Sequence, residues 1–501
     1  MAATEADADQ SAYENLLERH RRLSNLQMSS MLLHWDQQIM MPEGGAPARA
    51  QQLSALQATS HELLVEDEVG EWLDAVEDDD LDDDQTATVR EIQLNYDRAA
   101  NVPPELTEKI TQTASENQQI WQEAKANDDY AQFAPRLEIV RDLNRERAEY
   151  IDPDTDPYEV MYEDSNPYIP LEQMEEIFQT LREEIPPLVE EIRSDGRALG
   201  SPWEGEYPDE DQLALSEAAL DFLGYDRSRG RLDIAPHPFM SGSQFDARVT
   251  TRFKPTDPID ALTATIHEYG HASYQLGLRD DAYATPLGSP RSSGVHESQS
   301  RYWENHVGRT KPFWEEFLPT FTEHVDGHED LTVDDIYEAV NRINPDNLIR
   351  VEADELTYHM HIILRCEIDR AFVEGEIEAA DIPQVWNDTM EEYLGIRPET
   401  DTEGCLQDIH WTRSFAVFQG YTIGSVLAAQ LDAAIRSDLD VDALIREREF
   451  DQIREWMGEH VHQHGQRYTT PELIEEATGE PLTAEYFVDY AREKFETLYD
   501  L

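Results

Sequence analysis

The sequence contains few lysines, almost no cysteine and no long apolar run. Five of its 39 basic residues are lysine, and the bases face 107 acidic residues, which leaves a formal net charge of −68 over 501 residues. Because such a chain repels phosphate groups, we expect neither nucleic acid nor an anionic membrane as a partner. No apolar run approaches the roughly 18 residues that indicate a transmembrane helix, so no membrane span is predicted.

The two cysteines, Cys366 and Cys405, are too few for a disulfide scaffold. Sparse cysteine is typical of proteins in a reducing compartment. The segment Met1–Asp7 has neither a basic start nor an apolar core, so no signal peptide is predicted. We therefore expect a cytoplasmic protein.

The acidic excess is large enough to oppose folding in ordinary buffer, because like charges destabilise a compact state. At about 1 M salt the Debye length falls to about 3 Å, and most of this repulsion is screened. An acidic disordered chain is the alternative, but amphipathic segments, nine tryptophans and 21 tyrosines argue against it. The composition thus predicts a folded, halophilic protein of a salt-rich cytoplasm.

Apolar residues recur at helical spacing along most of the chain and predict a mainly α-helical fold. The predicted helices cover residues 10–30, 46–65, 85–100, 104–126, 129–149, 171–195, 209–223, 258–276, 296–307, 350–373, 415–436, 448–464 and 482–499.

The stretch Arg231 to Phe253 departs from the helical pattern. Residues 232–234 and 245–253 alternate between apolar and polar around Gly242, which predicts a small antiparallel β element. No Gly- or Ser-rich linker and no repeat divides the chain. We therefore expect a single domain over residues 1–501, a large helical body with a deep groove between two lobes.

A candidate metal-binding motif, His267-Glu268-Tyr269-Gly270-His271, lies in the predicted helix 258–276. Histidines four residues apart lie on the same helical face and can bind one ion, with Glu268 placed to reach a metal-bound water. Asp257 and Pro258 are a suitable cap and first residue for this helix. Two surface histidines on an ordinary helix are the alternative, but the capped amphipathic context favours a zinc peptidase site.

A third ligand is needed, with a fourth position left open. Glu297, 26 residues after His271, begins a second predicted helix and is the candidate that we favour. Spacing alone leaves Glu304 as an alternative, since it lies about two turns further along.

Several strings, in the same order along the chain, resemble the Taq-type metallocarboxypeptidases of peptidase family M32. They are residues 33–37, 41–42, 49–53, 237–239, 246–250, 296–301, 349–354 and 404–411. The resemblance implies a helical gluzincin fold and a homodimer. It also implies His267, His271 and Glu297 as metal ligands and Glu268 as the general base.

The same resemblance suggests roles for the remaining candidates. Arg350 and Arg248 would hold a substrate carboxylate or shape the closed end of the groove, and His410 would stabilise the reacting carbonyl. One stretch departs from the family pattern: residues 417–421 lack its first tyrosine and its proline, although Tyr421 remains as an oxyanion donor.

The chemistry is consistent with these roles. Zinc lowers the pKa of its water to about 7 and polarises a carbonyl, and a carboxylate such as Glu268 can move the proton. Arginine recognises a terminal carboxylate through its planar fork. The structural alternative for Arg350 and Arg248 is an ion pair with Asp354 and Asp246, respectively.

Three functions remain open from the sequence. The first is a zinc carboxypeptidase, with cobalt as the alternative ion, that releases single C-terminal residues from peptides. The second is a helical zinc oligopeptidase or dipeptidyl carboxypeptidase, which has the same ligands and a more distant carboxylate clamp. The third is a non-catalytic peptide-binding protein, which the complete motif argues against.

Overall fold

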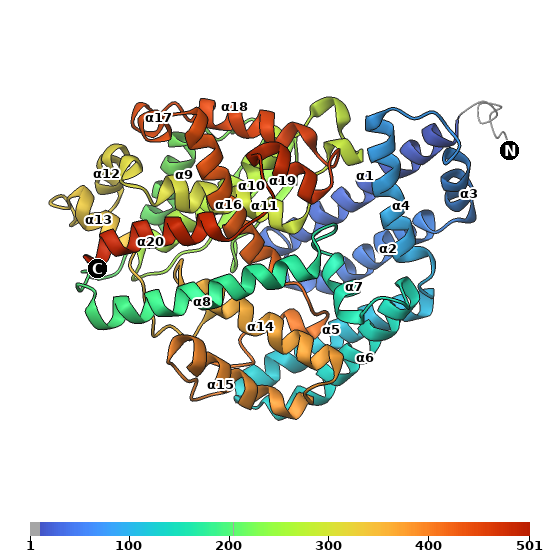
Figure 1. Cartoon of the computed structure of the whole chain (residues 1–501), viewed down its shortest axis with the longest axis horizontal. Helices are drawn as coiled ribbons and strands as arrows, with labels where there is room; N and C mark the ends of the chain where they lie inside the picture. Colours follow the sequence, from blue (N-terminus) through green and yellow to red (C-terminus); the bar gives the residue numbers. More distant parts are fainter. Residues whose placement is uncertain (1–10, 204) are drawn as a thin grey trace. The chain divides into compact units, whose positions relative to one another are not determined.

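The computed structural model describes residues 11–203 and 205–501, so the Met1–Asp7 segment lies outside the described residues. Within these residues the chain forms helices α1 to α20 and one three-stranded sheet (Figure 1). The prediction of a mainly α-helical fold is confirmed. None of the described helices combines the length and the apolarity that a membrane span requires.

The chain folds into two compact units, each assembled from three segments. Unit 1 contains the described residues of Met1–Asn101, Glu206–Arg291 and Glu447–Ala477. Unit 2 contains those of Val102–Gly205, Ser292–Arg446 and Thr478–Leu501. The single domain over residues 1–501 stays a prediction.

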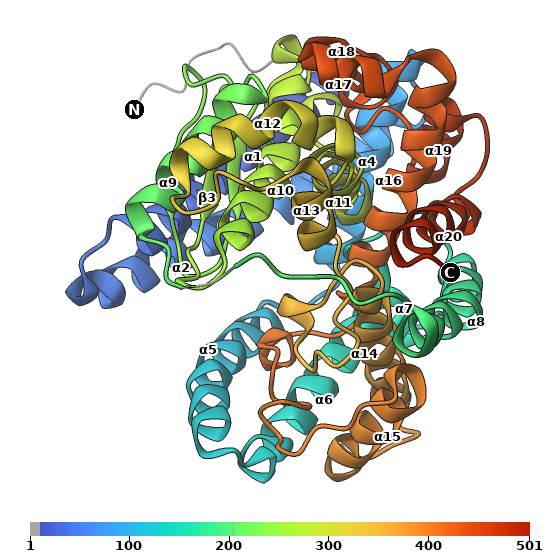
Figure 2. The same ribbon diagram turned by 90° about the vertical axis from the view of Figure 1, so that its left-hand side faces the viewer.

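Unit 1 places its sheet against its helices. Its helices are α1 (Ala12–Ile39), α2 (Ala46–Leu64), α3 (Asp67–Val76), α4 (Asp83–Ala100), α9 (Asp209–Phe222), α10 (Pro258–Gly277), α18 (Phe450–His460) and α19 (Thr470–Thr478). Strand β3 packs against α10, and β2 packs against both α10 and α1 (Figure 2). The sheet therefore supports the helix that carries the two motif histidines.

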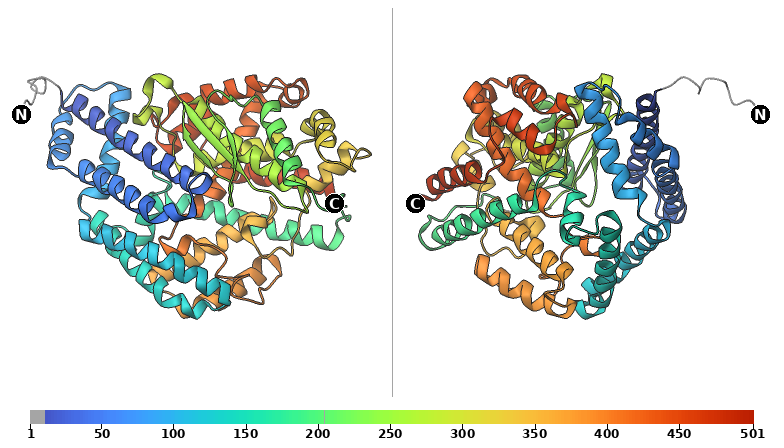
Figure 3. Two further views of the ribbon diagram at one scale, coloured as in Figure 1. Left: turned by 180° about the vertical axis from the view of Figure 1, so that it is seen from behind. Right: turned by 45° about the vertical axis from the view of Figure 1, so that its right-hand side comes forward.

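The sheet consists of β1 (Leu232–Ile234), β2 (Met240–Ser243) and β3 (Asp246–Thr251), in the order β1-β3-β2 (Figure 3, left). The predicted antiparallel pairing is present between β2 and β3 and wrong for β1 and β3, which run parallel. Strand β2, which was not predicted, lies between β1 and β3 in the sequence and runs antiparallel to β3. The chain therefore reverses direction twice, and β3 runs parallel to β1. Gly242 is required in the hairpin, since a Cβ there would lie 1.7 Å from the Asp246 carbonyl oxygen and its φ is +141°.

Unit 2 is built around α14 and α16, whose side chains are mostly buried. Its helices are α5 (Pro104–Asn127), α6 (Ala134–Ile151), α7 (Pro157–Glu163), α8 (Leu171–Asp195), α11 (Ser293–Arg301), α12 (Lys311–His324), α13 (Val333–Val340), α14 (Thr357–Glu374), α15 (Ile382–Leu394), α16 (Gln419–Asp438), α17 (Val441–Glu447) and α20 (Glu485–Tyr499). Helices α8 and α20 lie side by side (Figures 1 and 2), and α20 also packs on α16.

Some predicted helices begin or end differently. The predicted helix 350–373 splits into a 3₁₀ turn, Arg350–Glu352, and α14, because Asp354 caps the new start through the Leu356 and Thr357 amides. The predicted helix 296–307 is α11 followed by a π-helix, Tyr302–Gly308. Seven of the described helices were not predicted from the sequence: α3, α7, α12, α13, α15, α17 and α19.

Candidate functional site

Helix α10 begins as the sequence predicts. The Asp257 carboxylate accepts a hydrogen bond from the Ile259 amide at 3.1 Å, and Pro258 occupies the first turn. Further along, the Tyr269 hydroxyl donates to the Leu223 carbonyl at 3.0 Å and accepts from Arg454 at 2.7 Å. These contacts fix α10 against its neighbours in unit 1 and thereby fix the direction in which its motif side chains point.

The two motif histidines lie one turn apart on α10. The ring centroids of His267 and His271 are 5.0 Å apart, with an angle of 85° between the planes, and both residues are half-buried. Glu268, beside them, is buried. Two imidazoles on one face, with a buried carboxylate next to them, are the arrangement that the motif predicts.

Glu297 lies on α11, in unit 2, and is buried. Its Oε1 accepts a hydrogen bond from Arg301 Nε at 2.8 Å. The alternative ligand, Glu304, is engaged by two guanidinium groups, Arg301 at 3.3 Å and Arg309 at 2.7 Å. These ion pairs favour a structural role for Glu304.

His267, His271 and Glu297 form the candidate metal-ligand group among the described residues, each offering one ligand atom. Two imidazole nitrogens and one carboxylate oxygen are a known ligand set of catalytic zinc sites. The donor chemistry therefore fits a divalent ion of this kind.

Unit 2 also contains a buried cluster of two arginines around one carboxylate. Arg350 donates to Asp408 Oδ1 through Nε at 3.1 Å and Nη2 at 2.8 Å. Arg365 Nε donates to the other oxygen, Oδ2, at 2.6 Å. Burial alone would raise the pKa of Asp408, but the two guanidinium groups outweigh it and hold that pKa well below its usual range. Two cations facing one anion leave this cluster with an excess of positive charge.

The partner of Arg350 differs from the one considered in the sequence analysis. Asp354 caps α14, so the expected alternative, an Arg350–Asp354 ion pair, is wrong. Arg350 also donates through Nη1 to the Tyr358 hydroxyl at 3.2 Å. The side chain is thus held in one orientation by groups from two segments.

His410 lies next to this cluster, on a short 3₁₀ turn. Its ring packs on Phe418 with centroids 4.7 Å apart, and its Nδ1 lies 3.9 Å from Asp408 Oδ1. Burial lowers the pKa of His410 to about 4, so the imidazole is neutral at pH 7. A neutral imidazole keeps one N–H group, and this group can donate a hydrogen bond to a developing oxyanion.

Tyr421 lies in the first turn of α16, with the Arg350 guanidinium 5.4 Å from its ring centroid. Burial raises the pKa of Tyr421, so the hydroxyl stays protonated and can donate. A Cβ at the neighbouring Gly420 would lie 2.6 Å from Ser293 Oγ, so a side chain there would require the Ser293 hydroxyl to move.

Arg248 lies on β3 in unit 1 and is paired as the structural alternative anticipated. It donates to both oxygens of Asp246, from Nε at 2.9 Å and from Nη2 at 2.7 Å. Its guanidinium also lies 4.3 Å from the ring centroid of the buried Trp35. These contacts favour a structural role for Arg248 more strongly than the contacts of Arg350 favour one for Arg350.

The sequence analysis did not single out Asp408, Arg365, Tyr358 or Arg301. Asp408 belongs to the 404–411 string and Arg301 to the 296–301 string, so the strings themselves were a signal. Arg365 and Tyr358 lie on α14 with no spacing pattern to mark them, and their role appears only when the chain folds around Asp408.

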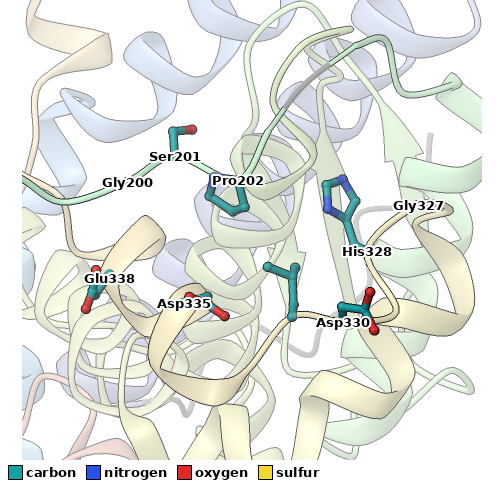
Figure 4. Close-up of a pocket in the computed structure, with 9 residues that line it drawn as sticks. Gly200, Ser201, Pro202, Gly327, His328, Asp330, Asp335 and Glu338 are labelled. Carbon is teal, nitrogen blue, oxygen red and sulfur yellow. The ribbon is translucent and has the colours of Figure 1, made fainter.

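One cavity of about 400 Å³ in unit 2 lies away from these residues (Figure 4). The residues that line it are Gly200, Ser201, Pro202, Gly327, His328, Asp330, Leu331, Asp335 and Glu338. None of the candidate site residues is among them. Its three carboxylates would repel a peptide carboxylate, so this cavity does not compete with the arginine cluster as a site for a peptide C-terminus.

Comparison with known proteins agrees with this geometry. The profile of the carboxypeptidase Taq (M32) metallopeptidase family matches residues 15–495. Carboxypeptidase 1 of Bacillus subtilis is 35% identical over 486 residues, covering 96% of this chain and 97% of the relative. Thermostable carboxypeptidase 1 of Pyrococcus furiosus is 35% identical over 489 residues, covering 96% and 98%.

A solved structure of an M32 carboxypeptidase is also similar to this chain over nearly its whole length. The crystal structure of the M32 carboxypeptidase from Deinococcus radiodurans R1 has a TM-score of 0.93 and 36% identity, covering 98% of this chain and 100% of that one.

Proposed function

Because this chain belongs to the carboxypeptidase Taq (M32) metallopeptidase family, we propose that it is a zinc-dependent enzyme that releases single amino acids from peptide C-termini with broad specificity. Membership makes it a carboxypeptidase, a hydrolase of peptide bonds that acts on peptides with a divalent metal. Zinc, the single-residue step and the roles of individual side chains are the parts that we propose.

The observation that carries the proposal is the excess of positive charge around Asp408. A carboxypeptidase must recognise a free α-carboxylate next to the bond that it cleaves. Arg350 is buried, held at a fixed angle and adjacent to a second guanidinium, which suits a planar carboxylate. We assign Arg350 as the carboxylate-binding residue, with Arg248 as a second candidate weakened by its pairing with Asp246.

The metal would be held by His267, His271 and Glu297, which supply the ligand set of catalytic zinc sites. When bound there, zinc activates water and polarises the scissile carbonyl. Cobalt is the alternative ion, since it accepts the same nitrogen and oxygen donors.

Glu268 is the proposed general base. It is buried next to His267, where little water competes for its hydrogen bonds. Its carboxylate would take the proton of the attacking water and deliver it to the leaving amine. Neutral His410 and protonated Tyr421 would donate hydrogen bonds to the carbonyl oxygen as negative charge develops on it.

The cellular setting is also proposed. Cys366 and Cys405 are buried and free, as expected in a reducing cytoplasm. The net charge of −68 supports a salt-rich interior. The homodimer rests on the family resemblance alone.

The experiment that tests the function compares two forms of one short peptide. Metal-loaded protein in about 1 M salt is incubated with the free acid and with its C-terminally amidated twin, and products are followed by mass spectrometry. Stepwise loss of single residues from the free acid alone supports the proposal. Dipeptide release or internal cleavage would support the oligopeptidase alternative, and no cleavage with zinc or cobalt would overturn the proposed catalysis.

A further inference from the structure

We propose that Gly424 and Arg301 are positioning residues that hold the Glu297 carboxylate from opposite sides in the orientation needed for metal binding. The inference rests on the proposed function, since it takes Glu297 as a metal ligand. Neither residue would touch the metal or the substrate.

The first side is a close approach of α16 to α11. A Cβ built on Gly424 would lie 2.3 Å from Glu297 Cγ, 2.5 Å from its Cβ and 3.0 Å from its backbone carbonyl carbon. These atoms belong to the ligand residue itself, and one of them is backbone. Any side chain at position 424 must therefore displace Glu297 or separate the two helices.

Two further glycines, one on each helix, also lie at the contact between α11 and α16. A Cβ at Gly294 of α11 would lie 2.4 Å from Ile423 Cγ2, and one at Gly420 of α16 would lie 2.6 Å from Ser293 Oγ. Small residues at four-residue spacing allow helix backbones to approach closely, and the contacts fix both the separation and the rotation of the helices. The rotation of α11 decides which way the Glu297 side chain points.

The second side is the guanidinium of Arg301, one turn along α11. Arg301 Nε donates to Glu297 Oε1 at 2.8 Å, which restrains the orientation of the carboxylate. The guanidinium lies 4.8 Å from the Tyr358 ring centroid and donates to Glu304 at 3.3 Å. The side chains of Glu297 and Glu304 are each only 9% exposed, so water competes little for these bonds.

The π-helix that follows α11 supplies the support for Arg301. It carries Glu304, which binds Arg301 on one side and Arg309 on the other. Arg309 is anchored in turn by the Val340 carbonyl at 3.0 Å. Side chains of alternating charge, Glu297, Arg301, Glu304 and Arg309, thus form a chain that ends on fixed backbone.

A ligand held in this way binds a metal without first being reoriented. Mutation of a residue that hydrogen-bonds a metal ligand typically lowers metal affinity by about 10- to 100-fold. We expect Arg301→Met and Gly424→Ala each to weaken Zn²⁺ binding by about this factor, and Arg301→Lys, which keeps the charge, to recover part of the loss.

The test measures metal affinity of the full-length apo-protein in about 1 M salt, by competition with a chelator of known Zn²⁺ affinity. The visible spectrum of the Co²⁺ form reports the ligand geometry independently of turnover. Thermal unfolding of the apo form separates positioning from stability: a positioning role changes the affinity of the folded protein, and a purely structural role lowers the melting temperature alone.

Matched controls exist in the chain. Gly458, within α18, has no atom within 4 Å of its missing Cβ, so Gly458→Ala should leave affinity unchanged. Arg370 pairs with Glu374, four residues later on α14, and also with Glu175. Arg370→Met therefore tests the loss of an arginine that forms ion pairs at the surface of unit 2.

The variant Glu297→Gln tests the ligand role of Glu297 separately from the positioning roles of Arg301 and Gly424. If Glu297→Gln loses affinity while Arg301→Met and Gly424→Ala match the wild type, the positioning inference is overturned and the proposed ligand set stands. If Glu297→Gln itself binds Zn²⁺ like the wild type, the proposed ligand set is overturned, and the inference with it. Should Arg301→Met fail to fold, Arg301→Lys and Gly424→Ala decide the outcome.

Discussion

At the scale of single residues, Asp408 determines how Arg350 can act. One carboxylate shared between two guanidinium groups holds both in place and neutralises only one of them. Placing charges in a buried position is unfavourable unless they are paired, so the unbalanced charge favours an incoming anion. A peptide carboxylate is an anion that this cluster can accept.

Replacing Arg350 with alanine should therefore affect substrates that carry the anion. We expect Arg350→Ala to weaken transition-state binding of free-acid peptides by about 2 kcal/mol or more, about 30-fold in kcat/KM. The amidated peptide, which lacks the carboxylate, should show little further loss. Equal losses for both substrates would mean that Arg350 supports the structure only.

Glu268 allows a sharper test, because glutamine has the same shape and no basic oxygen. Glu268→Gln should bind zinc with wild-type affinity and lose at least about 100-fold in kcat, the lower end of a general base's contribution. Affinity is measured by chelator competition and turnover with the same peptide. Hydrolysis at the wild-type rate would remove Glu268 from the mechanism.

At the scale of elements, the loop that carries His410 is tied to α14 by one buried acid. The Asp369 carboxylate accepts hydrogen bonds from Trp411 Nε1 and from the Ala416 amide. Burial raises the pKa of Asp369 to about 7. Its ordinary value in an unfolded chain is about 3.9.

The sign of the linkage follows from this difference. Asp369 contributes stability that is fully present below about pH 4 and is lost as the pH rises towards about 7, because the folded state binds the proton more tightly than the unfolded state. We expect Asp369→Asn to remove this pH-dependent contribution to the free energy of unfolding, because asparagine does not titrate. The stability difference between wild type and variant, from denaturant unfolding in high salt, should therefore shrink between pH 5 and 8.

An exposed acid, Asp78, gives the matched control. Asp78→Asn is measured in parallel, since it removes one carboxyl group from the surface and leaves the buried Asp369 in place. A difference for Asp369→Asn that does not depend on pH would show that this carboxyl titrates normally.

The elements also show where sequence reasoning works. Helix α10, with a polar cap, a first-turn proline and a continuous apolar face, is predicted within one residue, because each of these signals is local. Short helices such as α17 and α13, with seven and eight residues, were missed, because they give too few turns to show a period.

Other features depend on contacts that no local pattern encodes. The parallel pairing of β1 with β3 follows from a four-residue strand, β2, that carries little alternation. The arrangement of Arg350, Arg365 and Asp408 joins residues more than 40 positions apart. The proposed metal ligands could be named from spacing and resemblance, whereas the partners that we propose to orient Glu297 could not.

At the scale of the whole molecule, we expect the net charge of −68 to dominate the response to salt. We expect dilution from about 1 M to about 0.01 M KCl, where the Debye length grows from about 3 Å to about 30 Å, to unfold the chain. Circular dichroism during dilution measures the transition. Sucrose at matched osmolarity should not substitute for salt, since it carries no charge to screen the repulsion. A chain that stays folded at low salt would contradict the predicted halophilic adaptation.

The division of each unit into three separated segments has a consequence for synthesis on the ribosome. Unit 1 is completed by residues 447–477 and unit 2 by residues 478–501, where α20 covers α8 and α16. Neither unit can close while the nascent chain is still short, although domains usually fold in order from the N-terminus. The growing polypeptide must therefore carry incomplete hydrophobic faces until residues 447–501 have been synthesised, a period in which chaperones would have most to protect.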